Sequence, residues 1–248
     1  MQEINTIQGQ SNIELSVVVL GYRAGEVLKI FVAQVIESLI RNNISYQLVL
    51  VGNYWPNTDD KTLEIIRELA RVNKNIKPVI KEKEGGMGWD LRSGLEAADG
   101  KYIAFIDGDG QMPAEDVVKV YQKIKNSDLD LVKTCRYIRY DEKWRKAISF
   151  FYNLLFKVLF PGLNAKDINS KPKIFTKKFY DKMELKSDDW FADAEIMIEA
   201  RRLKAKIGEV PTIFKKNEHR PSFVKFSAIF EFIKNFIIYR IREFKRNK

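Results

Sequence analysis

The chain has very few of the residues that build the commonest disulfide and zinc sites. Its 248 residues include one cysteine, Cys135, and one histidine, His219. A single cysteine excludes an internal disulfide framework. A single histidine excludes a zinc site with several histidine ligands, and it excludes any Ser/His triad that does not use His219. The sequence therefore excludes internal disulfides and multi-histidine zinc sites, and a Ser/His triad would have to use His219. We interpret His219 as a loop residue.

Long apolar runs are also absent. Nowhere do about 18 consecutive apolar residues occur, which is the length that an ordinary membrane span requires, and residues 1–12 are polar, unlike a secretion signal. Basic residues are in excess, with 43 lysines and arginines against 33 acidic residues and a net charge of +10. This excess favours an anionic partner, which can be nucleic acid, nucleotide phosphates or an anionic membrane surface.

Strands and helices alternate through the first half of the sequence. Apolar, β-branched runs predict strands at 15–20, 47–51, 76–80, 102–106 and 129–134, and helical spacing of apolar residues predicts helices at 26–40, 63–72, 91–98 and 113–124. This order predicts an α/β fold with a mostly parallel sheet and helices on both faces. The carboxyl ends of such strands share one edge of the sheet, where ligands bind in open α/β folds.

The second half is less regular. Helices are expected at 144–160, 193–203 and 226–244, with a strand at 207–214. We interpret this half as an appendage to the first and not as an independent domain.

The segment Asp107-Gly108-Asp109-Gly110-Gln111 directly follows the strand expected at 102–106. Two carboxylates at a ligand-binding edge are costly unless a cation neutralises them. Mg²⁺ or Mn²⁺ suits oxygen ligands and bridges a diphosphate. The alternative is a plain turn, because Asp-Gly is a common turn dipeptide.

The run from Gly88 to Gln111 resembles the family 2 glycosyltransferases, which have the GT-A (Rossmann-like) fold. It is most similar to the branch of dolichol-phosphate mannosyltransferases and related polyprenyl-phosphate sugar transferases. The resemblance extends over about residues 16–225. It implies a metal site at Asp107, Asp109 and Gln111, catalytic roles for Asp107, Asp109 and Asp193, and nucleotide-sugar contacts by Leu20, Tyr22, Glu26, Asn53, Gly88, Arg92, Asp107, Gly108 and Asp109. Arg92 can instead be a solvated helix charge.

On the acceptor side, Asp193-Ala194-Glu195 resembles the family's Asp-x-Glu at the start of a helix. Asp193 can be a helix cap, a general base for a hydroxyl acceptor, or an organising residue for a phosphate, which needs no base. The resemblance implies that the acceptor phosphate is held by Arg136, Arg145, Ser149 and Arg220. Weaker candidates are Asp167, Lys171, Glu195 and Lys225. For Arg136 and Arg145, the alternative is routine surface charge at the start of a helix.

The sequence departs from the family pattern after two strands. Many members have Pro-x-Tyr-Asn-Glu after the first, where this chain has Leu20 to Glu26, and Val-Asp-Asp-Gly-Ser after the second, where this chain has Val51 to Trp55. The usual base-contacting aspartate is missing, and Asn53 can still offer a carbonyl acceptor and an amide donor. The departure leaves open the nucleobase and hence the donor sugar.

The helices expected at 144–160 and 226–244 are rich in phenylalanine and isoleucine and carry basic residues. This composition favours helices that lie at a lipid interface, and core packing or an oligomer interface is the alternative. We therefore expect a GT-A catalytic domain at 1–225, with a nucleotide-sugar half at 13–135 and an acceptor half at 136–225, followed by a basic amphipathic helix at 226–248. The expected location is the cytoplasmic face of a membrane, peripherally bound.

Together these features predict an inverting, metal-dependent hexosyltransferase that moves a sugar from a GDP- or UDP-sugar to a dolichyl or undecaprenyl phosphate. The same fold acting on a saccharide or another hydroxyl is the first alternative. A non-catalytic nucleic-acid-binding module is the second, but no nucleic-acid partner is expected, because the paired carboxylates would repel phosphate without a metal.

Overall fold

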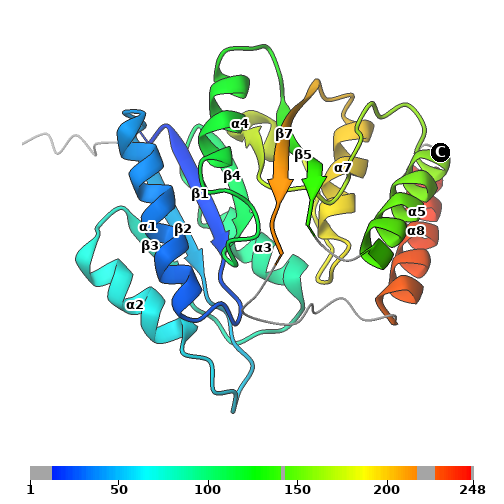
Figure 1. The fold of residues 1–248 in the computed structure, drawn as a ribbon. Coiled ribbons are helices and arrows are strands. Elements are labelled where there is room, and N and C mark those ends of the chain that lie inside the picture. Colours follow the sequence, from blue (N-terminus) through cyan, green and yellow to red (C-terminus); the bar gives the residue numbers. More distant parts are fainter. Residues whose placement is uncertain (1–12, 141–142, 217–226, 247–248) are drawn as a thin grey trace, which may run out of the picture.

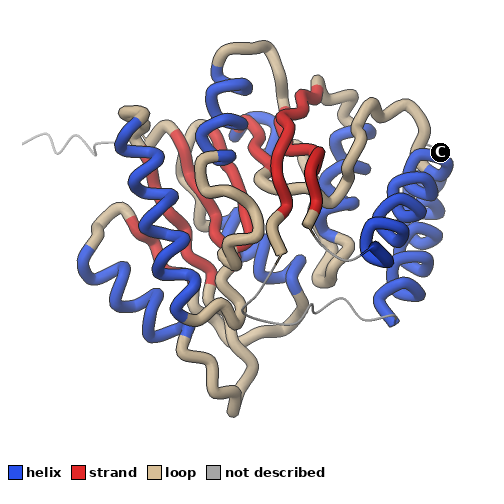
Figure 2. Tube along the Cα trace, in the orientation of Figure 1, coloured by secondary structure: helices blue, strands red, loops and turns tan. Residues whose placement is uncertain are grey.

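The computed structural model describes residues 13–140, 143–216 and 227–246 (Figures 1 and 2). The strands are β1 (Leu15–Leu20), β2 (Tyr46–Val51), β3 (Ile76–Val79), β4 (Tyr102–Asp107), β5 (Leu131–Arg139), β6 (Lys173–Thr176) and β7 (Ile207–Phe214). The helices are α1 (Glu26–Arg41), α2 (Thr62–Val72), α3 (Met87–Glu96), α4 (Asp116–Lys125), α5 (Lys143–Leu159), α6 (Lys177–Tyr180), α7 (Ala192–Arg202) and α8 (Ser227–Arg246).

All of these strands belong to one sheet, in the order β3-β2-β1-β4-β6-β5-β7. Every neighbouring pair is parallel except those that involve β6, which runs antiparallel to both β4 and β5. The register of β1 and β4 sets Leu20 beside Asp107. The carboxyl ends of β1 and β4 therefore reach the same edge of the sheet, as the alternating sequence predicts.

Alternate residues of the strands enter two separate apolar cores. Val17 and Val19 of β1 pack with α1, α2 and α4 on one face, whereas Val18 packs with α3 and α7 on the other. All six residues of β1 are buried, which is typical of a parallel strand that is covered on both faces. The expected mixed α/β fold, with a mostly parallel sheet between two helix layers, is confirmed.

Strand β6 and the short helix α6, which together cover residues 173–180, are not predicted by the sequence patterns. Strand β6 has only four residues and includes a lysine, Lys173, that is fully buried in the middle of the sheet. Neither feature is typical of an interior strand. Helix α3 also differs from the expectation, since it begins at Met87, four residues before the helix expected at 91–98.

Helices α5 and α8 lie side by side at one end of the sheet (Figure 1). Tyr152 of α5 has its ring centroid 5.1 Å from that of Phe232 and 5.0 Å from that of Phe236, both of α8. Helix α8 is also joined to the α7 region, because Asn235 donates to Asp189 at 2.8 Å and the Tyr239 hydroxyl donates to Glu195 at 2.7 Å.

The outer faces of these two helices are apolar and exposed. On α5 the exposed side chains are Phe150, Phe151, Leu154 and Val158, and on α8 they are Ile233, Ile237, Ile241 and Phe244. Within the described ranges, no helix has both the length and the apolar composition that crossing a membrane requires.

Gly94 of α3 gives a test of the packing between this helix and the sheet. A Cβ atom at Gly94 would overlap the side chain of Val18 and lie 2.7 Å from Cγ2 of Val51, and both valines are fully buried. Overpacking of this kind costs about 1–3 kcal/mol, which exceeds the roughly 0.5–1 kcal/mol that alanine gains over glycine inside a helix. We therefore expect Gly94→Ala to lower the free energy of unfolding by about 1–2 kcal/mol in denaturant titrations.

Glu96→Ala on the exposed side of the same helix is the control, and we expect a change within about 0.5 kcal/mol. Equal stability of Gly94→Ala and the wild type would show that α3 is not packed against the sheet in this way.

Candidate active site

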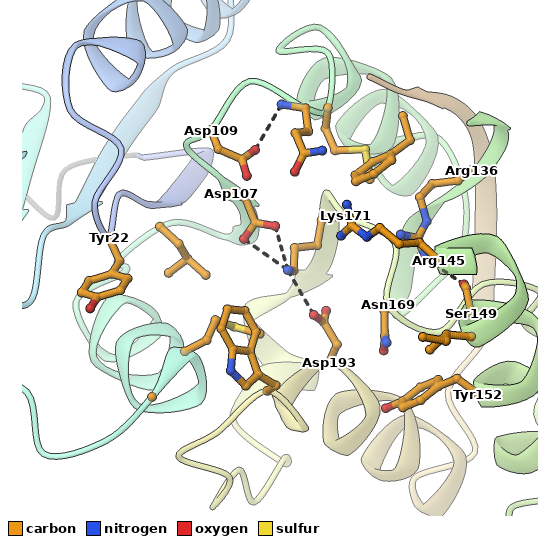
Figure 3. Close-up of a pocket in the computed structure, with 18 of the residues that line it drawn as sticks. Tyr22, Asp107, Asp109, Arg136, Arg145, Ser149, Tyr152, Asn169, Lys171 and Asp193 are labelled. Atoms are coloured by element: carbon orange, nitrogen blue, oxygen red, sulfur yellow. Dashed lines mark hydrogen bonds and ion pairs between the residues drawn. The ribbon is translucent and has the colours of Figure 1, made fainter. Parts of the chain in front are cut away.

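A pocket of about 430 Å³ opens at the carboxyl ends of β1, β4 and β5 (Figure 3). One side is acidic and carries Asp107, Asp109 and Gln111, which follow β4. The opposite side is basic and polar and carries Arg136 of β5 with Arg145 and Ser149 of α5. Asp193 and Lys171 lie between the two sides (Figure 3). The resemblance assigned these eight residues to the site, and the fold brings them together around one cavity.

Lys171 links two of the carboxylates. Its Nζ is 2.9 and 3.1 Å from the two oxygens of Asp107 and 3.2 Å from Oδ2 of Asp193. Lys173, two residues later, pairs with the other oxygen of Asp193. Asp193 therefore contacts two ammonium groups while its own side chain is almost completely buried.

These contacts determine the charge states of the cluster. Burial alone would raise the pKa of Asp193, but Lys171 and Lys173 outweigh burial and hold its pKa below the ordinary value. Burial lowers the pKa of Lys173 to about 8, with a further contribution from Lys171, although Asp193 opposes both. Asp193 is therefore an ionised carboxylate at neutral pH and a weak proton acceptor.

The acidic side has a donor set that fits a hard divalent ion. Partial burial raises the pKa of Asp107, and the neighbouring Asp109 adds to this effect, so that Lys171 only partly offsets it. A pair of carboxylates that one ammonium does not fully compensate favours further positive charge. Gln111 donates its amide nitrogen to the carbonyl of Lys215 at 3.1 Å, which leaves its side-chain oxygen as an acceptor.

No group of three or more histidine, cysteine, aspartate or glutamate side chains within the described ranges is arranged to hold a metal. The acidic side offers two carboxylates and the Gln111 oxygen as hard oxygen donors, and such a small set fits Mg²⁺ or Mn²⁺ only where substrate phosphate completes the coordination.

On the basic side, Arg136 is held by Asp167. The guanidinium donates to both carboxylate oxygens at 2.7 Å, and its Nη2 lies 3.5 Å from Oγ of Ser149. Arg145 and Ser149 both line the pocket from α5, as their spacing of four residues predicts. Asp167 is therefore a support for Arg136 and not itself part of the pocket wall.

Two polar atoms on this side lack a partner. The hydroxyl of Tyr152 and the side-chain oxygen of Asn169 are buried, and the described part of the chain offers neither of them a hydrogen bond. Both residues line the pocket beside Ser149 (Figure 3). Buried polar groups without partners in a native fold call for an explanation, and a bound ligand would satisfy both.

At the end of the pocket near β1, the wall is formed by Leu20, Tyr22, Lys83 and Asp90. Lys83 is paired with Asp90, and its Nζ lies 4.4 Å from the centroid of the Tyr22 ring. Asn53 is buried behind this wall. Its amide donates to Asp90 at 3.0 Å and to Ser93 at 2.9 Å, and its oxygen accepts from the backbone of Lys81 at 2.9 Å.

Five residues that the resemblance assigned to the nucleotide sugar do not line the pocket. Asn53 has its amide groups occupied within the protein, as described above. A Cβ atom at Gly88 would overlap the carbonyl of Ser187, so glycine here permits close approach of α3 to that segment. Arg92 pairs with Asp188, and Glu26 is exposed in the first turn of α1. The fifth residue, Gly108, lies where a Cβ atom would be 3.1 Å from the carbonyl of Leu20, so it allows close contact between the ends of β1 and β4.

Glu195 is also a structural residue here, since it accepts hydrogen bonds from the backbones of Lys186 and Ser187 and from Tyr239. Arg220 and Lys225 lie outside the described residues, as does His219.

Sequence reasoning missed several residues of the pocket wall. The charged and polar ones are Lys83, Asp90, Tyr152, Asn169 and Lys216, and the aromatic ones are Trp55, Trp144, Trp190, Phe214 and Phe232. Only Asn169 carried a usable signal, because it lies between the two weaker candidates Asp167 and Lys171. The others come from elements whose faces toward the pocket depend on tertiary packing.

The Arg136–Asp167 pair predicts a specific acid dependence of stability. Although burial alone would raise the pKa of Asp167, Arg136 lowers it from 3.8 to about 2. A carboxylate with a depressed folded-state pKa stabilises the fold above its unfolded pKa, and this contribution is lost as the pH falls from about 4 toward 2. At about 1.4 kcal/mol per pKa unit the contribution is roughly 2 kcal/mol.

We therefore expect Asp167→Asn to lower the free energy of unfolding by roughly 2–3 kcal/mol at pH 6, and the difference from wild type to shrink by roughly 1 kcal/mol at pH 3. Denaturant titrations at both pH values measure this. The exposed Asp128 supplies the control, since Asp128→Asn should change stability little at either pH. A difference for Asp167→Asn that does not depend on pH would contradict the assignment.

The chain is similar to known glycosyltransferases. The family model described as "Glycosyl transferase family 2" matches residues 16–189, which is more than half of the chain. A dolichol-phosphate mannosyltransferase from Pyrococcus furiosus is 26% identical over 238 residues, covering 94% of this chain. The chain spans 64% of the length of that protein, and only 38% of a Bacillus subtilis glycosyltransferase that is 30% identical over 145 residues.

Among solved structures, glucosyl-3-phosphoglycerate synthase from Mycobacterium tuberculosis, in a complex with Mn²⁺ and uridine diphosphate, aligns with a TM-score of 0.68 at 15% identity and covers 93% of this chain and 81% of that one. Mannosyl-3-phosphoglycerate synthase from Rubrobacter xylanophilus aligns with a TM-score of 0.71 at 13% identity, covering 94% and 76%. At these identities the structural likeness shows the fold alone, which is the GT-A fold. Because the family model matches residues 16–189, a range that includes the acidic motif at 107–111, the chain belongs to glycosyl transferase family 2.

Proposed function

We propose that the chain transfers a sugar from a nucleotide-sugar donor, a GDP- or UDP-sugar, to a polyprenyl phosphate at a membrane surface, with inversion at the anomeric carbon. The observation that carries the choice of acceptor is the pairing of the buried Asp193 carboxylate with the ammonium groups of both Lys171 and Lys173. A hydroxyl acceptor requires a base to remove its proton, and an aspartate held in its ionised form by two lysines is a weak base. A phosphate is already ionised and requires none.

The two sides of the pocket then have separate tasks. The acidic side, with Asp107, Asp109 and Gln111, would hold the donor diphosphate through Mg²⁺ or Mn²⁺, which when bound offsets the charge that develops on the leaving nucleoside diphosphate. Lys171 adds a positive charge at the same place. The basic side, with Arg145 and the Asp167-supported Arg136, would hold the acceptor phosphate, because guanidinium groups match phosphate oxygens in pairs.

Catalysis in this arrangement depends on positioning. The chain brings an anionic acceptor and a sugar donor to opposite sides of one cavity, so that the phosphate oxygen attacks the anomeric carbon as the diphosphate leaves from the other face. The unpaired Tyr152 hydroxyl and Asn169 oxygen support a polar contact with the acceptor or with the sugar at the basic side. No covalent bond to the protein is needed.

The membrane surface is supported by the position of the exposed apolar residues. The outer faces of α5 and α8 lie next to the basic side of the pocket, since Arg145 and Ser149 belong to α5 itself. An apolar face of this kind allows the isoprenoid part of an acceptor to remain in lipid while its phosphate reaches Arg145. The similarity to a dolichol-phosphate mannosyltransferase favours the same acceptor class.

A second candidate keeps the donor chemistry and uses a small phosphorylated hydroxyl compound as acceptor. It is favoured by the structural similarity to glucosyl-3-phosphoglycerate synthase, which is described in complex with phosphoglyceric acid. Turnover with 3-phosphoglycerate compared with turnover with undecaprenyl phosphate distinguishes the two. Membership of the chain in glycosyl transferase family 2 favours sugar transfer over the nucleic-acid-binding alternative.

Donor binding gives the first test. A ligand that binds only the folded state raises its melting temperature, so we expect UDP or GDP together with Mn²⁺ to raise the melting temperature more than either alone. Asp109→Asn should abolish the increase and reduce turnover by about 10²-fold or more, because a metal ligand of the leaving group is lost. Asp128→Asn, at an exposed site away from the pocket, is the control. A full thermal shift in Asp109→Asn would refute the metal role of Asp109.

Membrane attachment is tested by sedimentation with anionic vesicles. Phe150, Phe151 and Val158 of α5 are 64%, 65% and 68% exposed, so replacing all three by serine removes apolar surface without opening the core. We expect the triple variant to bind vesicles much more weakly, because interfacial binding scales with buried apolar area.

The matched control replaces Ile40 of α1 and Val72 of α2, which are 60% and 84% exposed on another face of the molecule, by serine. Equal sedimentation of the α5 variant and this control would reject attachment through α5.

A further inference from the structure

Lys171 occupies an unusual position in the pocket. Its side chain is almost fully buried, yet its ammonium contacts both oxygens of Asp107, at 2.9 and 3.1 Å, and Oδ2 of Asp193, at 3.2 Å. The Asp107 side chain is 36% exposed and opens into the pocket. The ammonium therefore interacts with the same carboxylate oxygens that a divalent ion would use.

The neighbouring Lys173 is different. Its ammonium pairs with Asp193 alone and lies 5.4 Å from the centroid of the Phe105 ring, fully buried inside the sheet. If Lys171 moves, Asp193 still keeps a positively charged partner. Asp107 does not, because Lys171 is its ion-pair partner among the described residues. The Lys171–Asp107 ion pair is thus the one in this group of charges in which another cation could replace the lysine.

We propose that Lys171 is a resident cation of the donor site, which makes binding of the divalent ion depend on binding of the donor diphosphate. In the free protein the ammonium competes with a dication for Asp107, because two cations at one carboxylate repel each other. A diphosphate offers the ammonium other anionic oxygens, so the dication and the nucleotide bind together. This inference rests on the proposed function, and it adds Lys171 as the residue that couples binding of the dication to binding of the donor diphosphate.

The coupling has a reciprocal consequence. If a nucleoside diphosphate strengthens binding of the dication by some factor, the dication strengthens binding of the nucleotide by the same factor. Without Lys171 the factor should fall, because Asp107 is then available to the dication before the nucleotide arrives.

The test is a Mn²⁺ titration followed by the electron paramagnetic resonance signal of free Mn²⁺, for the full chain with and without UDP or GDP. For wild type we expect weak binding of Mn²⁺ alone and clearly tighter binding with the nucleotide. For Lys171→Met we expect Mn²⁺ alone to bind about 10- to 100-fold more tightly than to wild type, the range by which partners of metal ligands alter affinity. The nucleotide should then add less.

Three further variants keep the result interpretable. Lys171→Gln removes the charge and keeps a hydrogen-bond donor, so it should behave as Lys171→Met does even if the latter folds poorly. Lys171→Arg retains a cation and should resemble wild type. Lys178→Met removes a positive charge from the exposed side of α6, outside the pocket, and should leave Mn²⁺ affinity unchanged.

Mn²⁺ affinity that is the same in wild type, Lys171→Met and Lys171→Gln, with equal enhancement by nucleotide, overturns the proposal and leaves the proposed function intact. A rise in Lys178→Met as large as in Lys171→Met also overturns it, because net charge would then be the cause. If no variant binds Mn²⁺ with either nucleotide, the metal part of the proposed function fails together with this inference.

Discussion

The site depends on the compensation of buried carboxylates by two lysines that belong to the segment leading into one short strand. Asp107 ends β4, Asp193 begins α7, and Lys171 and Lys173 connect them. A buried charge that loses its partner destabilises a fold by about 3–5 kcal/mol, so these three elements cannot shift independently. Strand β6 lies between β4 and β5 and runs against both, and this topology brings the lysines to the carboxylates.

Much of the fold followed from local patterns. The β-branched runs of β1, β2 and β4, and the helical spacing of α1, α5 and α8, are visible in the sequence because each element buries a regular set of positions. The acidic motif at 107–111 was predicted at the ligand edge of the sheet for the same reason. Strand β6 was not predicted, because it has only four residues. One of them, Lys173, is a lysine that is buried through an ion pair with Asp193, which lies 20 positions away in the sequence.

The end of the pocket near β1 illustrates a different limit of prediction from sequence. The resemblance assigns roles by position in a motif, but a side chain is available to a ligand only if the protein does not already use it. Asn53 follows β2 as the family's base-contacting residue does, yet its amide groups bind Asp90, Ser93 and the backbone of Lys81. Lys83 and Asp90 form the wall instead, and neither could be recognised without the packing of α3 beside β2.

Helix α8 carries an apolar outer face, and its inner face holds the segment that precedes and begins α7. Asn235 and Tyr239 bind Asp189 and Glu195, which lie four residues before and two residues after Asp193. The helix is therefore part of the frame that fixes the orientation of the central carboxylate. Evolution can therefore replace the exposed outer side chains of α8 more freely than it can discard the helix, whose loss would disturb the site.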